Sequence, residues 1–324
     1  MANNNTLVET EETTIRKQAS DALRKAALSE EAKAYLLSNP VLFNLLLKAA
    51  RRYIGGETLE QALETRKELR AQGYQTSLEF MGENVTTVAE ANEATHEFLR
   101  IIEALKGENK GDRVTLDLSH IGLGLDHKLG MDNFRKLAKA SENTSIDLFI
   151  SAEGLDRTDE VLDAYFHFSR EFPHVNLTLQ AYLHRTKNDL AKVLKESRGK
   201  VRMSKGAFDG PKELYLPRGP ELDDRYIELV NTLLEAKRFC SFATHDPKMV
   251  ERIMPLLKQR HIDSSTYEFE MLFGIGESLL QRLKNQGYPC RRYVVYGKEW
   301  YLYLCNRIAE NPDSLFRALV DIMS

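Results

Sequence analysis

Apolar residues in the first part of the chain recur at the three- and four-residue spacing of an amphipathic helix. This spacing predicts helices through residues 1–72, and Pro40 is expected to open the second apolar stretch, because proline is favoured at the first position of a helix. The positions that carry the pattern are Leu23, Ala26, Ala27, Tyr35, Leu36, Val41, Leu42, Leu45 and Leu46.

Beyond residue 72 the pattern changes to short β-rich runs, each followed by a polar segment with helical periodicity, and the alternation repeats about eight times. Strands that are joined through helices pair in parallel, and eight such units can close into a barrel without an exposed edge. We therefore predict an α/β fold, a (βα)8 TIM-type barrel over 73–324 behind an N-terminal helical segment over 1–72. The predicted strands are 76–81, 113–118, 145–150, 175–182, 201–205, 239–244, 267–272 and 291–296.

An open, doubly wound parallel sheet is the alternative fold. Its dinucleotide fingerprint, GxGxxG after the first strand, is absent, and GLGLD at 122–126 does not match it. The barrel is therefore favoured, and its chemistry is expected at the carboxyl ends of the strands.

Composition excludes several classes of protein. The 324 residues carry 45 Lys plus Arg against 48 Asp plus Glu, a net charge of -3, so no basic surplus favours a nucleic-acid partner. The three cysteines lack CxxC spacing, which suggests neither a disulfide framework nor a structural zinc site. No secretory signal or run of about 18 apolar residues occurs, so we expect a cytoplasmic protein without a transmembrane segment.

Polar residues gather where the predicted strands end. Each alone is explained by a helix cap or a rim salt bridge, so the signal lies in their convergence. These residues are Glu83, Asp117, Ser119, Ser151, Glu153, Gln180, Arg202, Lys205, His245, Asp246, Glu270 and Tyr296.

Three segments permit two interpretations. Thr244, His245 and Asp246 resemble a metal or acid–base site, but no second His stands at ligand spacing, so we expect no metal, and Asp246 before Pro247 equally suits a helix N-cap. Arg202, Lys205 and Gly206 would suit an anionic cofactor, or an ordinary basic strand end. Arg307 and Glu310 share one face of a C-terminal helix and could form a plain ion pair.

Taken together, several segments are similar to the proline dehydrogenase family, flavin-dependent (βα)8 barrels that oxidise proline to its cyclic imine. The likeness spans nearly the whole chain, and the segments occur in the family order. They are RRYIGGETLEQAL (51–63), FMGENV (80–85), VTLDLSHIGL (114–123), LQAYLHRT (179–186), RMSKGAF (202–208), ATHD (243–246), FEMLFGI (269–275) and YVVYGKEWYLYLCNRIAENP (293–312).

The resemblance implies an FAD over the barrel mouth, which makes 73–324 the FAD-binding catalytic domain. Arg202 matches an Arg beside flavin N5, and Gln180 matches a Gln at the isoalloxazine edge. A fixed guanidinium there would stabilise the negative charge that a flavin gains with hydride. The positions implied to hold the cofactor are Gln180, Arg202, Lys205, Gly206, Ala207, Thr244 and His245. Those implied to enclose the substrate are Leu272, Tyr296, Arg307 and Glu310.

The chain departs from the family pattern in the substrate pocket. The first of two adjacent carboxylate-clamping arginines is Asn306, before Arg307, and the family Lys on the second strand is Asp117. The third-strand Asp aligns with Ser151, and a family Tyr is Phe208. Lys to Asp removes two positive units, Arg to Asn removes one and Asp to Ser restores one, so the pocket becomes about two units more negative.

This change predicts poor binding of free proline and an altered substrate. Suitable substrates are secondary or cyclic amines that lack a free α-carboxylate, carry a further cation near Asp117, or present the carboxyl as an amide, ester or thioester. Such an amine must lose its ammonium proton before hydride leaves, and Asp117 is the first candidate base, with Tyr296 the second.

Two other functions remain open. The first is an ordinary L-proline dehydrogenase that passes electrons to a membrane quinone. The second is a non-catalytic relative that binds flavin or a partner as a regulator. The N-terminal helices could contact a membrane peripherally, cap the barrel or form a dimer contact.

Overall fold

The computed structural model describes residues 2–27, 29–82, 84–107, 111–206, 208, 210–310 and 314–323. Helices fill the segment before the first strand, as predicted, and Pro40 opens α3 at its first position. The bounds there are α1 Ala2–Ala27, α2 Glu30–Ser38, α3 Pro40–Ala50 and α4 Leu59–Ala71.

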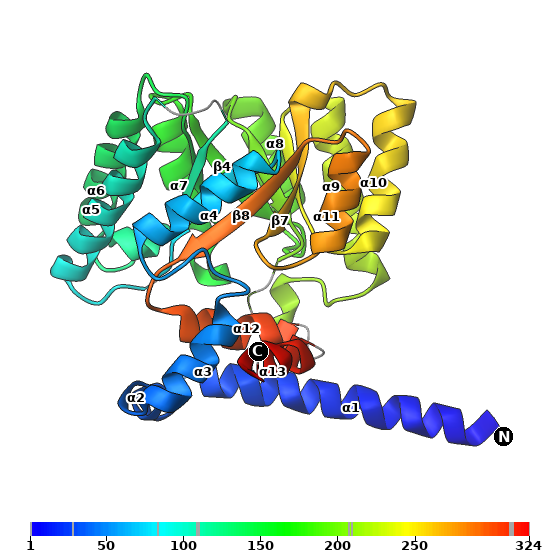
Figure 1. Ribbon diagram of the computed structural model, residues 1–324. Helices are drawn as coiled ribbons and strands as arrows, with labels where there is room; N and C mark the ends of the chain where they lie inside the picture. Colours follow the sequence, from blue (N-terminus) through cyan, green and yellow to red (C-terminus); the bar gives the residue numbers. More distant parts are fainter. Residues whose placement is uncertain are drawn as a thin grey trace.

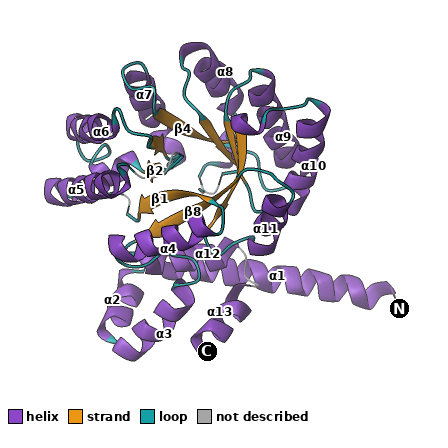
Figure 2. Ribbon diagram, turned by 45° about the horizontal axis from the view of Figure 1, so that its top comes forward, coloured by secondary structure: helices purple, strands orange, loops and turns teal. Residues whose placement is uncertain are grey.

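Eight parallel strands close into a barrel in chain order, with β1 pairing to both β2 and β8. Figure 2 shows the strands as a ring inside a circle of helices. The predicted (βα)8 fold is confirmed, and each predicted strand is found to within two residues at either end. The strands are β1 Gln75–Phe80, β2 Arg113–Leu116, β3 Asp147–Ile150, β4 Val175–Gln180, β5 Val201–Ser204, β6 Cys240–Ala243, β7 Tyr267–Leu272 and β8 Cys290–Tyr296.

The outer helices pack apolar faces against the strands and begin at recognisable caps. Thr87 and Glu90 form a reciprocal capping box at α5, and the Asp246 carboxylate accepts the Lys248 amide at α10, where Pro247 is the first residue. These helices are α5 Val88–Leu105, α6 His127–Ser141, α7 Thr158–Ser169, α8 Thr186–Glu196, α9 Pro220–Glu235, α10 Pro247–Gln259 and α11 Glu277–Asn285. Short 3-10 helices occupy Leu118–Ile121, Leu155–Arg157, Lys212–Leu214 and Ser264–Thr266.

The two ends of the chain meet below the carboxyl ends of the strands. Helix α12, Trp300–Glu310, follows β8 and packs along α1, while α13, Ser314–Met323, packs on α3 (Figure 1). A second apolar cluster joins these helices to the inner face of β8 through Leu47, Trp300, Leu304 and Val295. The terminal helices therefore form a floor under the barrel mouth.

One glycine marks how closely this floor approaches the strand ends. Gly274, after β7, has φ +77°, and a Cβ there would lie 1.9 Å from the carbonyl oxygen of Arg52. Only glycine satisfies both conditions at this position. The turn after β7 is thus shaped by the N-terminal helices.

The predicted boundary after residue 72 falls between α4 and β1. Leu59, Ala62 and Leu69 of α4 belong to the barrel core, whereas α1 to α3 pack with the C-terminal helices. The division of the chain into 1–72 and 73–324 stays a prediction. Within the described ranges, no helix is long and apolar enough to cross a membrane.

Candidate active site at the barrel mouth

Helix α12 lies across the mouth and directs polar side chains toward the strand ends. The Arg307 guanidinium bonds Glu310 at 2.6 Å and lies 5.1 Å from the centre of the Tyr303 ring. Tyr303 interacts electrostatically with Arg202 and Glu79, and Arg307 with His245, so this face of α12 looks into the mouth. The predicted pairing of Arg307 with Glu310 is found here.

Arg202 on β5 has a fixed position in the mouth. Its Nε donates to Glu270 of β7, and its guanidinium carbon lies 4.7 Å from the centre of the Tyr293 ring. Burial alone would lower the pKa of Arg202, but Glu270, Tyr293 and Glu79 together outweigh burial and raise it. The side chain is a permanent, oriented cation.

Tyr293 was missed by the sequence-based assignment. Its hydroxyl donates to Glu79 of β1 at 2.5 Å. Burial raises the pKa of Tyr293 well above the usual value, and the negative charges of Glu79 and Asp117 raise it further. Strand alternation places Arg291, Tyr293 and Val295 on one face of β8, and the bond from Arg291 to Glu268 shows that this face is the inner one.

The structure corrects the placement of Tyr296. This residue lies on the opposite face of β8, fully buried, and its hydroxyl donates to Glu97 of α5 at 2.8 Å. Burial, followed by the bond to Glu97, raises the pKa of Tyr296, which also makes it unsuited to act as a base. It packs between barrel and helix, outside the mouth.

His245 ties the ends of β6 and β7 together. Its Nε2 accepts the Leu272 amide at 2.9 Å, and burial, with Arg307 next, lowers the pKa of His245 to about 3. The ring is therefore neutral and carries its proton on Nδ1. Thr244 is buried and accepts the Asp246 amide at 3.2 Å. In the described part of the chain, no group of three or more His, Cys, Asp or Glu side chains could hold a metal ion.

The segment after β5 that begins with Lys205 already binds other side chains of the protein. The Lys205 ammonium bonds Asp223 at 2.5 Å and Asp246 at 2.8 Å. Gly206 has φ +106°, and a Cβ there would lie 2.2 Å from the Tyr182 ring, so packing already requires a glycine. The Tyr182 hydroxyl donates to the Phe208 carbonyl at 3.1 Å. Ala207 lies outside the described residues.

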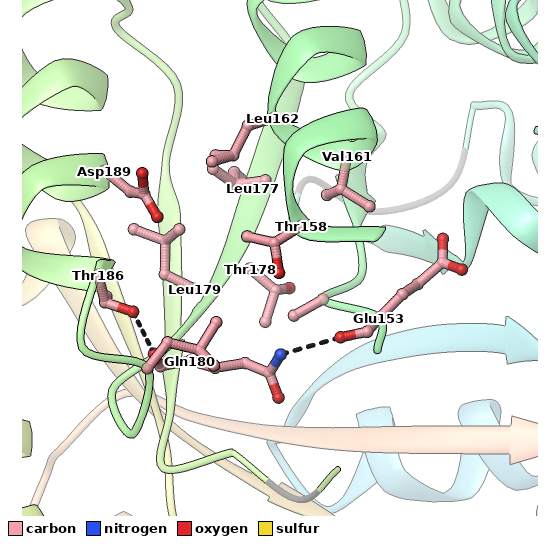
Figure 3. Close-up of a pocket in the computed structure, with 12 residues that line it drawn as sticks. Glu153, Thr158, Val161, Leu162, Leu177, Thr178, Leu179, Gln180, Thr186 and Asp189 are labelled. Carbon is pink, nitrogen blue, oxygen red and sulfur yellow. Dashed lines mark hydrogen bonds between the residues drawn. The ribbon is translucent and has the colours of Figure 1, made fainter. Parts of the chain in front are cut away.

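Gln180 ends β4 beside a small cavity. Its side-chain amide nitrogen donates to the backbone carbonyl of Glu153 at 3.1 Å, and its backbone carbonyl accepts the Thr186 hydroxyl at 2.5 Å (Figure 3). The cavity that these residues line holds about 20 Å³, which is room for roughly one water molecule. This cavity is too small to be a cofactor site, so any contact of Gln180 with a flavin would be made from its mouth-facing side.

The departures from the family pattern lie on neighbouring strands and on α12. Asp117 is half-buried and follows β2, and Ser151 is buried after β3, where its amide donates to the Leu116 carbonyl at 2.9 Å. Asn306 is half-buried on α12, three residues from Tyr303 and four from Glu310, so it shares their face. Asp117 therefore follows a strand of the barrel, whereas Asn306 stands on α12.

Polar groups on α12 are suited to a planar ligand with acceptor atoms. Among the described residues, the Tyr303 hydroxyl and the Arg307 Nε are buried without a hydrogen-bond partner. Unsatisfied buried donors are uncommon, and they face the same space as Arg202. The ring carbonyls and nitrogens of a flavin are acceptors of this kind, so the residues present fit such a group.

Comparisons with known proteins agree with this geometry. Residues 62–316 match the family model described as "Proline dehydrogenase". The chain is 32% identical over 297 residues to "Proline dehydrogenase" of Deinococcus radiodurans, covering 89% of this chain and 94% of that protein. It is 30% identical over 267 residues to "Proline dehydrogenase 2" of Bacillus subtilis strain 168, covering 82% and 88%.

A solved structure supports the fold. Proline utilization A (PutA) from Bdellovibrio bacteriovorus, inactivated by N-propargylglycine, superposes with a TM-score of 0.78 at 18% identity. The match covers 94% of this chain but only 37% of that longer one, and at this identity it bears on the fold alone. With the family model and the two relatives, the predicted resemblance is confirmed, and the chain belongs to the proline dehydrogenase family of flavin-dependent oxidoreductases.

Proposed function

We propose that this chain is an FAD-dependent dehydrogenase that oxidises a cyclic or secondary amine, proline or a proline derivative, to an imine. Bound FAD would supply the hydride acceptor. The observation that carries the proposal is Arg202, a half-buried cation held by Glu270 and Tyr293 near the unsatisfied donors of α12. The names of the relatives, both proline dehydrogenases, point to the same chemistry.

Arg202 is suited to stabilise negative charge at the mouth. A preorganised cation costs no reorganisation when charge develops, and its effect is large in a site from which water is excluded. His245, neutral and bonded to Leu272, would line the cofactor without opposing Arg202. Gln180, Lys205, Gly206, Ala207 and Thr244 stay proposed cofactor positions.

The walls of the mouth argue for a substrate without a free α-carboxylate. Arg307 is already bonded to Glu310, and Asn306 beside it carries no charge. Glu79 on β1 and Asp117 after β2 add negative charge, so they would repel a free substrate carboxylate. The cation left to pair with that carboxylate on α12 is Arg307, which Glu310 already shares. An amine with an amide, ester or thioester in place of the carboxylate, or with a second cation, suits this environment.

Proton removal from the substrate is assigned to Asp117. Its half-buried carboxylate stands at the end of β2, and its charge contributes to the raised pKa of Tyr293. Tyr293 itself is a poor base because its proton is held by burial and by Glu79. Leu272, Phe208 and Ser151 would shape the remaining wall, with Arg307 and Glu310 orienting the substrate.

The test is anaerobic bleaching of the flavin. The protein is purified with excess FAD, its visible spectrum is recorded, and L-proline, prolinamide and a cyclic diamine are added separately. We expect bleaching by prolinamide or the diamine at concentrations where proline has little effect. A colourless protein would contradict the cofactor assignment, and a yellow protein that no amine bleaches would favour a non-catalytic relative.

An ordinary L-proline dehydrogenase with a quinone acceptor is the second candidate, and the names of the relatives favour it. Turnover of free L-proline with a quinone analogue, at an affinity similar to that for prolinamide, would support it over the altered pocket. We propose a cytoplasmic location for either activity. Peripheral membrane association belongs to the quinone alternative and is tested by co-sedimentation with vesicles.

A further inference from the structure

A ladder of alternating charges runs through the inside of the barrel. It is formed by Arg202, Glu270, Arg113, Glu268 and Arg291, which come from β5, β7, β2, β7 and β8. Arg113 donates to Glu270 at 2.5 Å and to Glu268 at 2.6 Å, and Arg291 donates to Glu268 at 2.9 Å. Arg202 is the end that reaches the mouth.

Glu270 is the contact between Arg202 and the rest of the ladder. Its Oε1 accepts from Arg202, while its Oε2 accepts from Arg113 and, at 2.9 Å, from Ser241. Glu270 and Arg113 are each only 1% exposed. A carboxylate held from two sides in this way has no room to follow a moving partner, so Arg202 is fixed by its position.

The carboxylates of the ladder stay ionised. Burial alone would raise the pKa of Glu270, but Arg202 and Arg113 lower it below the usual value. Burial opposes ionisation of Glu268 as well, yet Arg113 and Arg291 bring its pKa to about 2. The negative charge of Glu270 therefore lies permanently behind the cation that faces the mouth.

We propose that Glu270 is a positioning residue that acts through Arg202: it orients the guanidinium toward the flavin and, by its charge, holds the reduction potential of that flavin down. This inference rests on the proposed function, since it requires a flavin beside Arg202. The isosteric change Glu270→Gln keeps an acceptor for Arg202 and removes the negative charge. The mouth then becomes more positive, which favours the reduced, more negative flavin.

The experiment measures the midpoint potential of the bound flavin against reference dyes in wild type, Glu270→Gln and Glu268→Gln. We expect Glu270→Gln to shift the equilibrium at least tenfold toward reduced flavin, which is about 30 mV upward for a two-electron couple. Glu268→Gln is the matched control, because it removes another buried carboxylate, one that bonds Arg113 but not Arg202. It should lose similar thermal stability and shift the equilibrium less than threefold.

An unchanged or lower potential in Glu270→Gln would overturn the proposal, as would equal shifts in both variants, which would indicate a general charge effect. If Glu270→Gln does not fold, Ser241→Ala replaces it. That variant removes an uncharged donor that Glu270 shares with Glu268 and leaves the charge of Glu270 less balanced. It should shift the equilibrium at least threefold toward oxidised flavin, and an unchanged potential would contradict the proposal. A protein that binds no flavin defeats the proposed function, whereas a yellow, amine-bleached protein with unmoved potentials defeats this inference alone.

Discussion

Tyr293 on β8 donates its hydroxyl to Glu79 on the adjacent strand β1, 2.5 Å away, across the closing seam of the barrel. The guanidinium of Arg202 covers the same ring. Three strands thus hold one aromatic side chain at the mouth, and its orientation is set by both a hydrogen bond and a cation–π contact. This is the geometry expected of a residue that positions a ligand.

Replacing Tyr293 by Phe should separate this role from stability. We expect amine turnover to fall about tenfold or more, because a preoriented polar group is lost at the mouth, with a stability loss of about 1 kcal/mol. Tyr296→Phe is the control: it loses the buried bond to Glu97 and a similar stability, but should leave turnover unchanged. Steady-state kinetics and urea unfolding of both variants check this, and equal turnover losses would refute the assignment.

The double change Asp117→Lys with Asn306→Arg should move selectivity toward free L-proline. It restores one cation after β2 and one on α12, and pairing a desolvated carboxylate with them is worth about 3 kcal/mol. We expect the ratio of kcat/KM for L-proline over prolinamide to rise about a hundredfold. An unaltered ratio in a folded, yellow variant would show that these residues do not contact the substrate.

Stability should decrease as the pH falls from about 6.5 to 4.5. Burial lowers the pKa of His120 to about 4, and that of His245 lies at about 3, so in this window the unfolded chain binds protons that the folded chain does not. The free energy of unfolding therefore decreases as the pH is lowered, by about 2 kcal/mol between pH 6.5 and 4.5 for His120 alone. Urea unfolding at both pH values measures the loss.

His120→Asn should remove the His120 share of this pH dependence, about 2 kcal/mol, and leave the share of His245. His261→Asn serves as the control, because His261 is exposed and should leave the dependence as in wild type. If the wild-type free energy of unfolding is the same at both pH values, the buried neutral state of His120 is wrong.

The buried ion pair between Arg66 of α4 and Asp112 before β2 should matter for stability but not for chemistry. Two nitrogens of Arg66 bind the two carboxylate oxygens at 3.2 and 2.7 Å, and both side chains are nearly inaccessible. Asp112→Ala removes the carboxylate that two nitrogens of Arg66 bind and should cost about 3 kcal/mol. The exposed pair of Lys128 and Asp132 gives the comparison, since Asp132→Ala should leave the unfolding midpoint unchanged within error. Similar midpoints for the two variants would contradict this.

Much of the architecture could be predicted from the chain. The switch from helical periodicity to eight β-rich runs separated by helices predicts the barrel, because parallel strands need long crossovers and closure removes their edges. The same rule places polar strand-end residues such as Arg202 and His245 at one mouth. The Asp246 cap and the Arg307–Glu310 pair also follow from spacing within a single element.

Other features were decided only by the tertiary structure. Period-two alternation says that Tyr293 and Tyr296 lie on opposite faces of β8, but which face is inside depends on how the barrel closes. Glu270 gains its role from Arg113, 157 positions away in sequence, and from Arg202, so local pattern could not pair them. Lys205 likewise meets Asp223 and Asp246 only after β5, α9 and α10 have packed. Local sequence sets periodicity and caps, whereas charge pairing inside a barrel is a property of which strands face one another.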